Sequence, residues 1–261
     1  MEEIYFSSGL FYGYGVFETL RVYNGKPFLL KRHVERLLKG AEILGIEHPP
    51  RGEIENLCFE KLKGLDFENI RLRITLTPKN LRDGIYPEGH LIFISARKYS
   101  PPPEEKYKTG YRLAISKIRR NETSPNPLIK SISYVENILA FRDARERGCD
   151  EAIFLNTKGF LTEGTRTNIF IVRDGVLITP RPSDGLLKGI TRDFVIELAG
   201  EKGIETYEGE IKIEELFSAD EVFITNSLIE IMPVSRIEDV EIKCPGDTAL
   251  SLLHEYRRRC G

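Results

Sequence analysis

The sequence lacks the features that would assign it to several large functional classes. No basic block stands apart from acidic neighbours, and 38 lysine and arginine residues face 40 acidic ones, for a net charge of -2. This balance excludes the basic surface typical of nucleic-acid-binding proteins. The four cysteines form no CxxC pair and only four histidines occur, so the pattern predicts neither a disulfide framework nor a metal site. A small molecule is the expected partner.

Long apolar runs and an export signal are missing too. No stretch approaches the length needed to cross a bilayer, and the acidic start MEEIYFSSGLFYGYG has no basic region followed by an apolar segment. Tryptophan and glutamine are absent, and charged residues make up 30% of the chain, a balance similar to that of heat-adapted proteins. We therefore expect no membrane association and a cytoplasmic location.

The chain is long enough, at 261 residues, for two domains with their own cores. Residues 17–30 alternate around Asn24-Gly25, which predicts a hairpin, and apolar residues recur at helical spacing over 30–44. The segments 99–110 and 119–127 are rich in proline, serine and asparagine. We predict a mixed α+β fold with an N-terminal α/β domain over 1–120, a linker over 121–127 and a C-terminal domain over 128–261.

Lys130 is the first candidate for chemistry. It lies in the stretch NPLIKSISYVENILA, directly after Leu128 and Ile129. Burial favours the neutral form of a lysine amine, which can then form a Schiff base with a carbonyl compound. Most lysines are solvated cations, however, and the local sequence alone favours that interpretation. Lys130 therefore needs support from other parts of the chain.

Several other residues could help to bind an anionic cofactor. Glu163 lies among strand-forming residues, where a carboxylate is costly unless it is paired, although it could also face water at a sheet edge. Ile190 and Thr191 follow a glycine at a helix start, where they could bind an anion or simply cap the helix. Thr225 at a strand end could bind phosphate or form a turn. Arg36 on the first long helix could bind phosphate oxygens, but solvated arginines are commoner.

The order of the motifs is more specific than any single motif. The chain resembles the fold-type IV pyridoxal-phosphate enzymes, the branched-chain aminotransferase-like family, in YGYGVFETLRV, HVERL, IKSISYVENILAFRDARERGCDEAIFLN, LTEGTRTNIFIV, GLLKGITRDFVIELA and FITNSLIEIMPV, from about residue 9 to 234. This group includes branched-chain and D-amino-acid aminotransferases and aminodeoxychorismate lyase. The resemblance implies a smaller α/β N-terminal domain, a larger C-terminal pseudobarrel, and a homodimer with the cofactor between the domains.

The resemblance also implies roles for individual residues. Lys130 matches the lysine that forms a Schiff base with pyridoxal 5'-phosphate, and Glu163 matches the carboxylate at the pyridine nitrogen. Tyr134 matches a tyrosine beside the cofactor ring. The phosphate-binding positions of the family are matched by Arg36, Ile190, Thr191 and Thr225. A substrate amine would displace Lys130, which would then move a proton while the ring stores charge.

Details of the motifs resemble the lyase more than the aminotransferases. These are TNSL before MPV, GVFETLRV, and the short length of the chain. Thr19 matches a threonine that the lyases share, a candidate catalytic proton relay during elimination of pyruvate from 4-amino-4-deoxychorismate to give 4-aminobenzoate for folate biosynthesis. It could also be a simple β-branched strand residue. D-amino-acid aminotransferases tend to have tyrosine where Phe17 stands.

The sequence also offers candidate substrate-binding residues and leaves other functions open. The candidate substrate-binding residues are Tyr12, Phe17, Arg82 and Arg166, of which the two arginines could instead be solvated. The chain departs from the family at Arg166, where a small residue is usual, and at Tyr14, where an acidic residue is usual. The alternatives to the lyase are a branched-chain or D-amino-acid aminotransferase that uses 2-oxoglutarate and, more remotely, a non-catalytic binding protein of the same fold.

Overall fold

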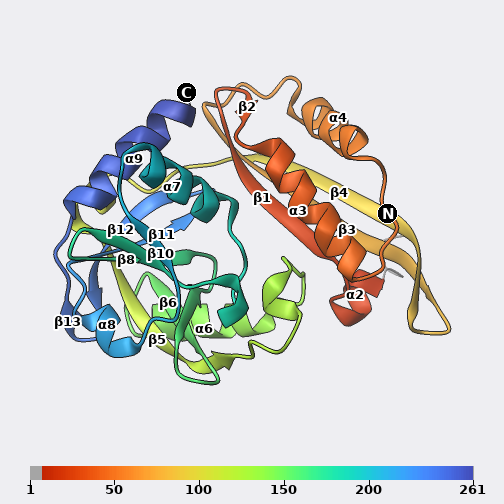
Figure 1. Cartoon of the computed structure of the whole chain (residues 1–261). Helices are drawn as coiled ribbons and strands as arrows, with labels where there is room; N and C mark the ends of the chain where they lie inside the picture. The colour runs from red at the N-terminus through yellow and green to blue at the C-terminus, as the bar shows by residue number, and fades with distance from the viewer. Residues whose placement is uncertain (1–7, 261) are drawn as a thin grey trace. The chain divides into compact units, whose positions relative to one another are not determined.

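The computed structural model describes residues 8–260, which form two compact units (Figure 1). The first unit extends to Ser100 and includes Ile129–Tyr134, and the second holds Pro101–Leu128 and the chain from Val135 onward. The sequence analysis places the boundary later, at 121–127. The two divisions differ because strand β5 (Tyr111–Arg120) pairs with β12 (Glu230–Ile237) and β6 (Glu151–Asn156) of the second unit. Lys130 belongs to the first unit.

The first unit is a four-stranded antiparallel sheet with two helices against one face (Figure 1). The strands run in the order β2-β1-β3-β4 and comprise β1 (Val16–Tyr23), β2 (Lys26–Pro27), β3 (Asn69–Arg82) and β4 (Tyr86–Lys98). The helices are α2 (Ser8–Tyr12), α3 (Leu30–Ile43) and α4 (Arg51–Leu62). Asn24 and Gly25 both have positive φ, as the predicted hairpin turn requires.

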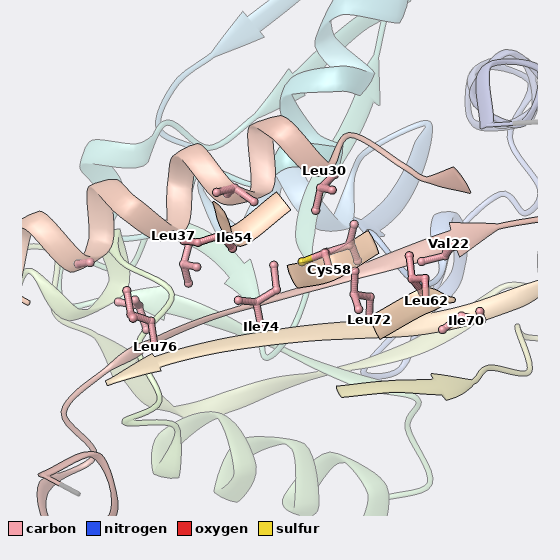
Figure 2. Packing of buried hydrophobic residues seen from close by; sticks show 14 of the residues in the cluster. Val22, Leu30, Leu37, Ile54, Cys58, Leu62, Ile70, Leu72, Ile74 and Leu76 are labelled. Atoms are coloured by element: carbon pink, nitrogen blue, oxygen red, sulfur yellow. The ribbon is translucent and has the colours of Figure 1, made fainter. Parts of the chain in front are cut away.

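Alternation along the strands positions the core of this unit. Figure 2 shows Leu72, Ile74 and Leu76 of β3 beneath Leu30 and Leu37 of α3. On β1 every second side chain belongs to the same buried row, because side chains alternate between the two faces of a sheet. This row consists of Val16, Glu18, Leu20 and Val22. It thus contains one carboxylate among aliphatic residues.

The second unit is built around a nine-stranded sheet that closes on itself. Its order is β10-β9-β8-β11-β12-β5-β6-β7, with β13 as the ninth strand beside β12, and β7 also pairs with β8 through Glu163 and Asn168. The closed ring therefore contains β8, β11, β12, β5, β6 and β7, which confirms the predicted pseudobarrel. The remaining strands are β7 (Leu161–Gly164), β8 (Asn168–Arg173), β9 (Val176–Thr179), β10 (Thr206–Glu208), β11 (Glu221–Asn226) and β13 (Val240–Glu241).

Five α-helices of the described chain belong to the second unit. They are α5 (Glu104–Thr109), α6 (Val135–Glu146), α7 (Ile190–Glu201), α8 (Ile213–Phe217) and α9 (Asp247–Cys260). Small side chains allow α6 to approach the barrel closely, since Ala140 and Ala144 pack against Ala114, Ala152 and Phe154. Within residues 8–260, no helix combines the length and the apolar character that a membrane span needs.

Candidate active site

The Lys130 segment is held alongside the first residues of β1. The Phe17 N–H donates to the Lys130 carbonyl at 2.9 Å, and the Ile132 N–H donates to the Gly15 carbonyl at 3.0 Å. Gly15 permits this approach, because a Cβ there would lie 2.8 Å from the Leu76 carbonyl oxygen. The neighbouring Ile129 is buried and Lys130 itself is half-buried. The backbone therefore fixes Lys130 at the edge of the first-unit core.

One predicted aromatic residue, Phe17, lies next to the Lys130 amine, and a second, Tyr134, packs against Phe17. The Nζ atom is 4.8 Å from the centroid of the Phe17 ring. The Tyr134 ring packs edge-to-face on Phe17, with centroids 5.6 Å apart and planes at 82°. Thr19 follows two positions after Phe17, so its half-buried side chain projects from the same face of β1. The structure thus brings Lys130, Tyr134 and Phe17 together, with Thr19 next along the strand.

Arg36 is held by a buried carboxylate. Glu18 is fully buried, and its two oxygens accept hydrogen bonds from Arg36 Nε at 2.7 Å and Arg36 Nη2 at 2.8 Å. Glu18 Oε2 also lies 2.7 Å from His33 Nδ1. A carboxylate with a bidentate guanidinium fixes both the charge and the orientation of the arginine. Arg36 therefore cannot rotate freely on the helix surface, unlike the solvated arginine of the alternative interpretation.

The charges in this cluster set the protonation of Glu18 and His33. Burial by itself would raise the pKa of the Glu18 carboxyl, but the nearby Arg36 and His33 lower this pKa to about 2. Burial lowers the pKa of His33, and the positive charges of Arg36 and Lys130 lower it further, against the attraction of Glu18. At neutral pH the imidazole is therefore uncharged, and its Nδ1–H donates to the Glu18 carboxylate.

In the second unit, Glu163 is buried and paired. Its Oε1 lies 3.2 Å from Arg120 Nη2, and its Oε2 accepts a hydrogen bond from the Leu187 N–H at 3.0 Å. The Arg120 guanidinium is itself 4% exposed and stacks 3.9 Å from the centroid of the Phe154 ring. The alternative of an edge-strand glutamate facing water is therefore wrong. The buried Glu163 carboxylate thus has a buried guanidinium as its partner.

The start of α7 gathers groups that can bind an anion. The N-cap residue of this helix is Gly189, which has no side chain that could accept a hydrogen bond from the first N–H groups. The Thr191 hydroxyl lies 3.4 Å from the Ser227 hydroxyl. The Asn168 side chain donates to the Leu187 carbonyl, and a Cβ at Gly189 would collide with the Asn168 side-chain oxygen. This loop is therefore held close to the start of β8.

A buried hydroxyl in this region shows that these residues fit a phosphate group. Thr225 is 1% exposed, and its Oγ1 is buried with no hydrogen-bond partner among the described residues. A buried hydroxyl without a partner is costly, and a phosphate oxygen would supply the missing acceptor. The donor set of hydroxyls and backbone N–H groups at a helix start suits an anion. The hydroxyls and backbone N–H groups of the second unit thus fit the phosphate of pyridoxal 5'-phosphate.

The Thr225→Val variant tests this fit. Without cofactor, the free energy of unfolding should stay equal or rise by about 1 kcal/mol, because an unsatisfied buried hydroxyl is removed. The dissociation constant of the cofactor should rise about tenfold, because one hydrogen bond to a charged group is lost. Urea unfolding of the apoenzyme and cofactor titration measure the two effects.

Thr162→Val is the matched control for that variant. Thr162 is also fully buried in the second unit, but its hydroxyl donates to the Phe154 carbonyl at 3.1 Å. Its replacement should destabilise the apoenzyme by about 1 kcal/mol and leave cofactor affinity unchanged. Equal behaviour of the two variants would contradict the role of Thr225.

The other predicted residues lie in less buried surroundings. Tyr12 is an exposed residue of α2. Arg82 is exposed at the tip of the β3–β4 hairpin and pairs with Glu88 at 3.2 Å. Arg166 is exposed and its guanidinium stacks 3.7 Å from the centroid of the Phe141 ring. The Tyr14 hydroxyl donates to the Leu44 carbonyl and thereby ties the start of β1 to the end of α3.

Sequence reasoning missed Glu18, Arg120 and the Leu187 N–H. For Glu18 a signal existed, since alternation assigns it to the same buried row as the flanking aliphatic residues of β1. An acid in such a row needs a cationic partner, and His33 and Arg36 share one face of the next helix. No local pattern identifies Arg120 or Leu187, because barrel closure brings them to Glu163.

Comparison with known proteins agrees with this geometry. The profile of the family described as amino-transferase class IV matches residues 15–237. A protein of Methanocaldococcus jannaschii with the provisional name branched-chain-amino-acid aminotransferase is 40% identical over 260 residues, which cover 97% of this chain and 89% of that protein. The aminodeoxychorismate lyase of Bacillus subtilis is 35% identical over 259 residues, which cover 95% of this chain and 86% of the lyase.

Solved structures agree with the sequence relatives. The T.th. branched-chain amino acid aminotransferase, solved with pyridoxamine 5'-phosphate, superposes with a TM-score of 0.90 at 31% identity, over 98% of this chain and 88% of that one. The profile spans most of the chain, and both relatives are similar over nearly their whole length. The chain therefore belongs to the class IV aminotransferase family and is an enzyme, aminotransferase or lyase, that uses pyridoxal phosphate.

Proposed function

We propose that this enzyme is a lyase that converts 4-amino-4-deoxychorismate into 4-aminobenzoate and pyruvate. The observation that carries the proposal is the position of Thr19. Its hydroxyl lies on the same face of β1 as Phe17, whose ring lies 4.8 Å from Lys130 Nζ. A hydroxyl on this face of the strand can pass a proton to a leaving group, which elimination requires and amino transfer does not.

The residues of both units receive roles in this proposal. Lys130 would hold the cofactor through its aldehyde, and a substrate amine would displace Lys130. Glu163, which pairs with the buried Arg120, would hold the protonated pyridine nitrogen. By the family resemblance, Tyr134 would lie beside the ring, and Arg36, Ile190, Thr191 and Thr225 would bind the phosphate. When bound, pyridoxal phosphate draws off the electron pair left at the substrate carbon.

The proposed conversion moves one proton and breaks one C–O bond. The amine-bearing ring carbon loses its proton to the displaced Lys130 amine. The bond from the neighbouring ring carbon to the enolpyruvyl oxygen breaks, and the ring becomes aromatic. Thr19 relays this proton from Lys130 to the methylene carbon of the departing group, which becomes pyruvate. The atoms of the substrate then account for both products, without water or an oxidant.

An aminotransferase is the second candidate, and one observation favours it. The relative with 40% identity carries the provisional name branched-chain-amino-acid aminotransferase. The purified enzyme should be incubated with 4-amino-4-deoxychorismate and, separately, with a branched-chain or D-amino acid plus 2-oxoglutarate. We expect pyruvate and 4-aminobenzoate in the first reaction. Rapid glutamate formation without any 4-aminobenzoate would instead establish the aminotransferase.

Thr19→Val should lower the rate of pyruvate release by about 10²-fold, because positioned proton transfer contributes at least that much. Valine keeps the branched shape of this strand residue, so the fold and the visible cofactor spectrum should not change. Thr19→Ser retains the hydroxyl and should keep most of the activity. A simple β-branched strand residue would behave in the opposite way, with valine tolerated as well as serine.

We also propose that the enzyme works as a cytoplasmic homodimer. The family resemblance supports the dimer, and the proposed soluble substrate fits a cytoplasmic location. Sedimentation analysis of the holoenzyme should give twice the mass of one 29.9 kDa chain. A mass equal to one chain would contradict the dimer.

A further inference from the structure

One face of the first-unit sheet carries positive charge without acidic residues. The strand registers set Thr19 opposite Arg73, and Arg73 opposite Ser95. Directly paired residues project from the same face, which is the face opposite the aliphatic row packed against α3. From the Phe17 pair to the Arg21 pair this face holds Phe17, Thr19, Arg21, Arg71, Arg73, Thr75, Phe93, Ser95 and Arg97. Basic and hydroxyl groups thus dominate it.

Arg73 is the arginine of this face whose guanidinium contacts the Phe17 ring. Its side chain is half-buried, and its Nε donates to Thr75 Oγ1 at 3.3 Å. Within residues 8–260 no carboxylate forms a salt bridge with it. Burial lowers the pKa of Arg73, and the positive charge of Arg71 lowers it further, while Tyr134 acts in the other direction. A guanidinium removed from water without an anionic partner is costly.

The position of Arg73 links it to the reacting amine. Its Cζ lies 3.9 Å from the centroid of the Phe17 ring, and Lys130 Nζ lies 4.8 Å from the same centroid. The distance between Arg73 Cζ and Lys130 Nζ therefore cannot exceed the sum of these two distances. A substrate amine that displaces Lys130 would bring its more distant atoms within reach of the guanidinium.

We propose that Arg73 binds a substrate carboxylate that lies several bonds away from the reacting amine. The inference rests on the proposed function, because aminodeoxychorismate carries its carboxylates on the opposite ring carbon and on the enolpyruvyl group. The guanidinium fork matches the two oxygens of a carboxylate.

Arg73 would also select against aliphatic amino acids. A branched alkyl side chain next to Arg73 would remove water from the guanidinium without supplying an acceptor. Sites built to hydrogen-bond a polar group reject analogues that lack it, because the polar partner is left unpaired. Arg73 would therefore determine the class of substrate, anionic rather than aliphatic.

Paired probes separate the charge interaction from general binding. 4-Aminobenzoate and 4-aminobenzamide have the same shape, but only the first is an anion. Calorimetric titration of the holoenzyme would measure both affinities in the wild type, Arg73→Gln and Arg73→Lys. Lys98→Gln is the matched control. Lys98 pairs with Ile70, a residue of the first-unit core, so the Lys98 side chain projects from the face opposite to that of Arg73.

Arg73→Gln should weaken 4-aminobenzoate binding about tenfold to a hundredfold, as expected for a charged hydrogen bond. It should leave 4-aminobenzamide binding within about twofold of the wild type. Lys98→Gln should change neither affinity. Arg73→Lys keeps the positive charge but lacks the forked guanidinium, so its affinity for 4-aminobenzoate should lie between those of the wild type and Arg73→Gln. If Arg73→Gln fails to fold, Arg73→Lys provides the test.

Other outcomes distinguish this inference from the proposed function. Glutarate serves as a second anionic probe. If the enzyme releases no 4-aminobenzoate from aminodeoxychorismate, but glutarate binding still depends on Arg73, the lyase assignment fails and the role of Arg73 stands. Equal effects on the benzoate and the benzamide, no effect on any anionic probe, or no saturable binding of either anion to the wild type would overturn the role of Arg73.

Discussion

Lys130→Ala is expected to remove the visible absorbance of the bound cofactor and to lower kcat by at least about 10³-fold, since proton transfer alone contributes about 10²–10⁴-fold. The loss should not come from unfolding. The Lys130 segment is attached to β1 through backbone groups, namely the Lys130 carbonyl and the Ile132 N–H. Absorbance spectra, steady-state rates and thermal unfolding of the variant measure these three properties.

Lys39→Ala is the control for that variant. Lys39 is an exposed lysine of α3 in the same unit, and its replacement should leave spectrum, rate and stability unchanged. A Lys130→Ala enzyme that kept the absorbance band and more than about a tenth of the wild-type rate would refute the role of Lys130.

Glu18→Ala should have the largest effect on stability. It leaves the Arg36 guanidinium and the buried His33 without the carboxylate that pairs with both. Removal of one partner from a buried ion pair costs about 3–5 kcal/mol. Urea unfolding at neutral pH measures the change. Cofactor affinity should fall as well, because Arg36 loses its fixed orientation.

Glu35→Ala provides the comparison for Glu18→Ala. Glu35 also pairs with an arginine, at 2.6 Å from Arg51, but both side chains are about half exposed. An exposed ion pair contributes about 0–1 kcal/mol. Both variants remove a glutamate side chain from the same unit. The difference between their losses in unfolding free energy therefore measures the effect of burial. Equal losses would contradict the assigned role of Glu18.

The pH dependence of stability follows from the same carboxyl. Its pKa in the folded protein is about 2, below the value of about 4.3 in an unfolded chain. The stability that ionised Glu18 contributes is therefore complete above about pH 5 and is lost as the pH falls toward 2. The difference in unfolding free energy between the wild type and Glu18→Gln should shrink over this range. A constant difference would show that Glu18 titrates normally.

Patterns of short range predicted much of the fold. The Asn24-Gly25 turn and the helix over 30–44 depend on neighbouring residues alone, and the structure has both. The mixed fold and the pseudobarrel followed from motifs arranged along the whole chain. The assignment of β5 to the second unit did not, because its pairing with β12 joins strands that are distant in sequence.

The candidate site was likewise predicted only in part. Lys130 and Glu163 were found through motifs, although the local sequence of Lys130 favoured a surface cation. The partners Arg120 and Glu18 were not found, since each lies on a different element from the residue that it holds. Arg73 gave no signal either. Only the register of β1 with β3 sets it beside Thr19, and only the structure shows it on the Phe17 ring.

The covalent position of the cofactor tests the central claim most directly. Borohydride reduction of the holoenzyme followed by tryptic digestion should leave the cofactor on a single peptide. Cleavage after Lys130 would be blocked by the modification, so this peptide should span residues 121–142. Mass spectrometry should locate the added mass on Lys130, and Lys130→Ala should take up no label. A label on any other lysine, or none on the wild type, would contradict the account.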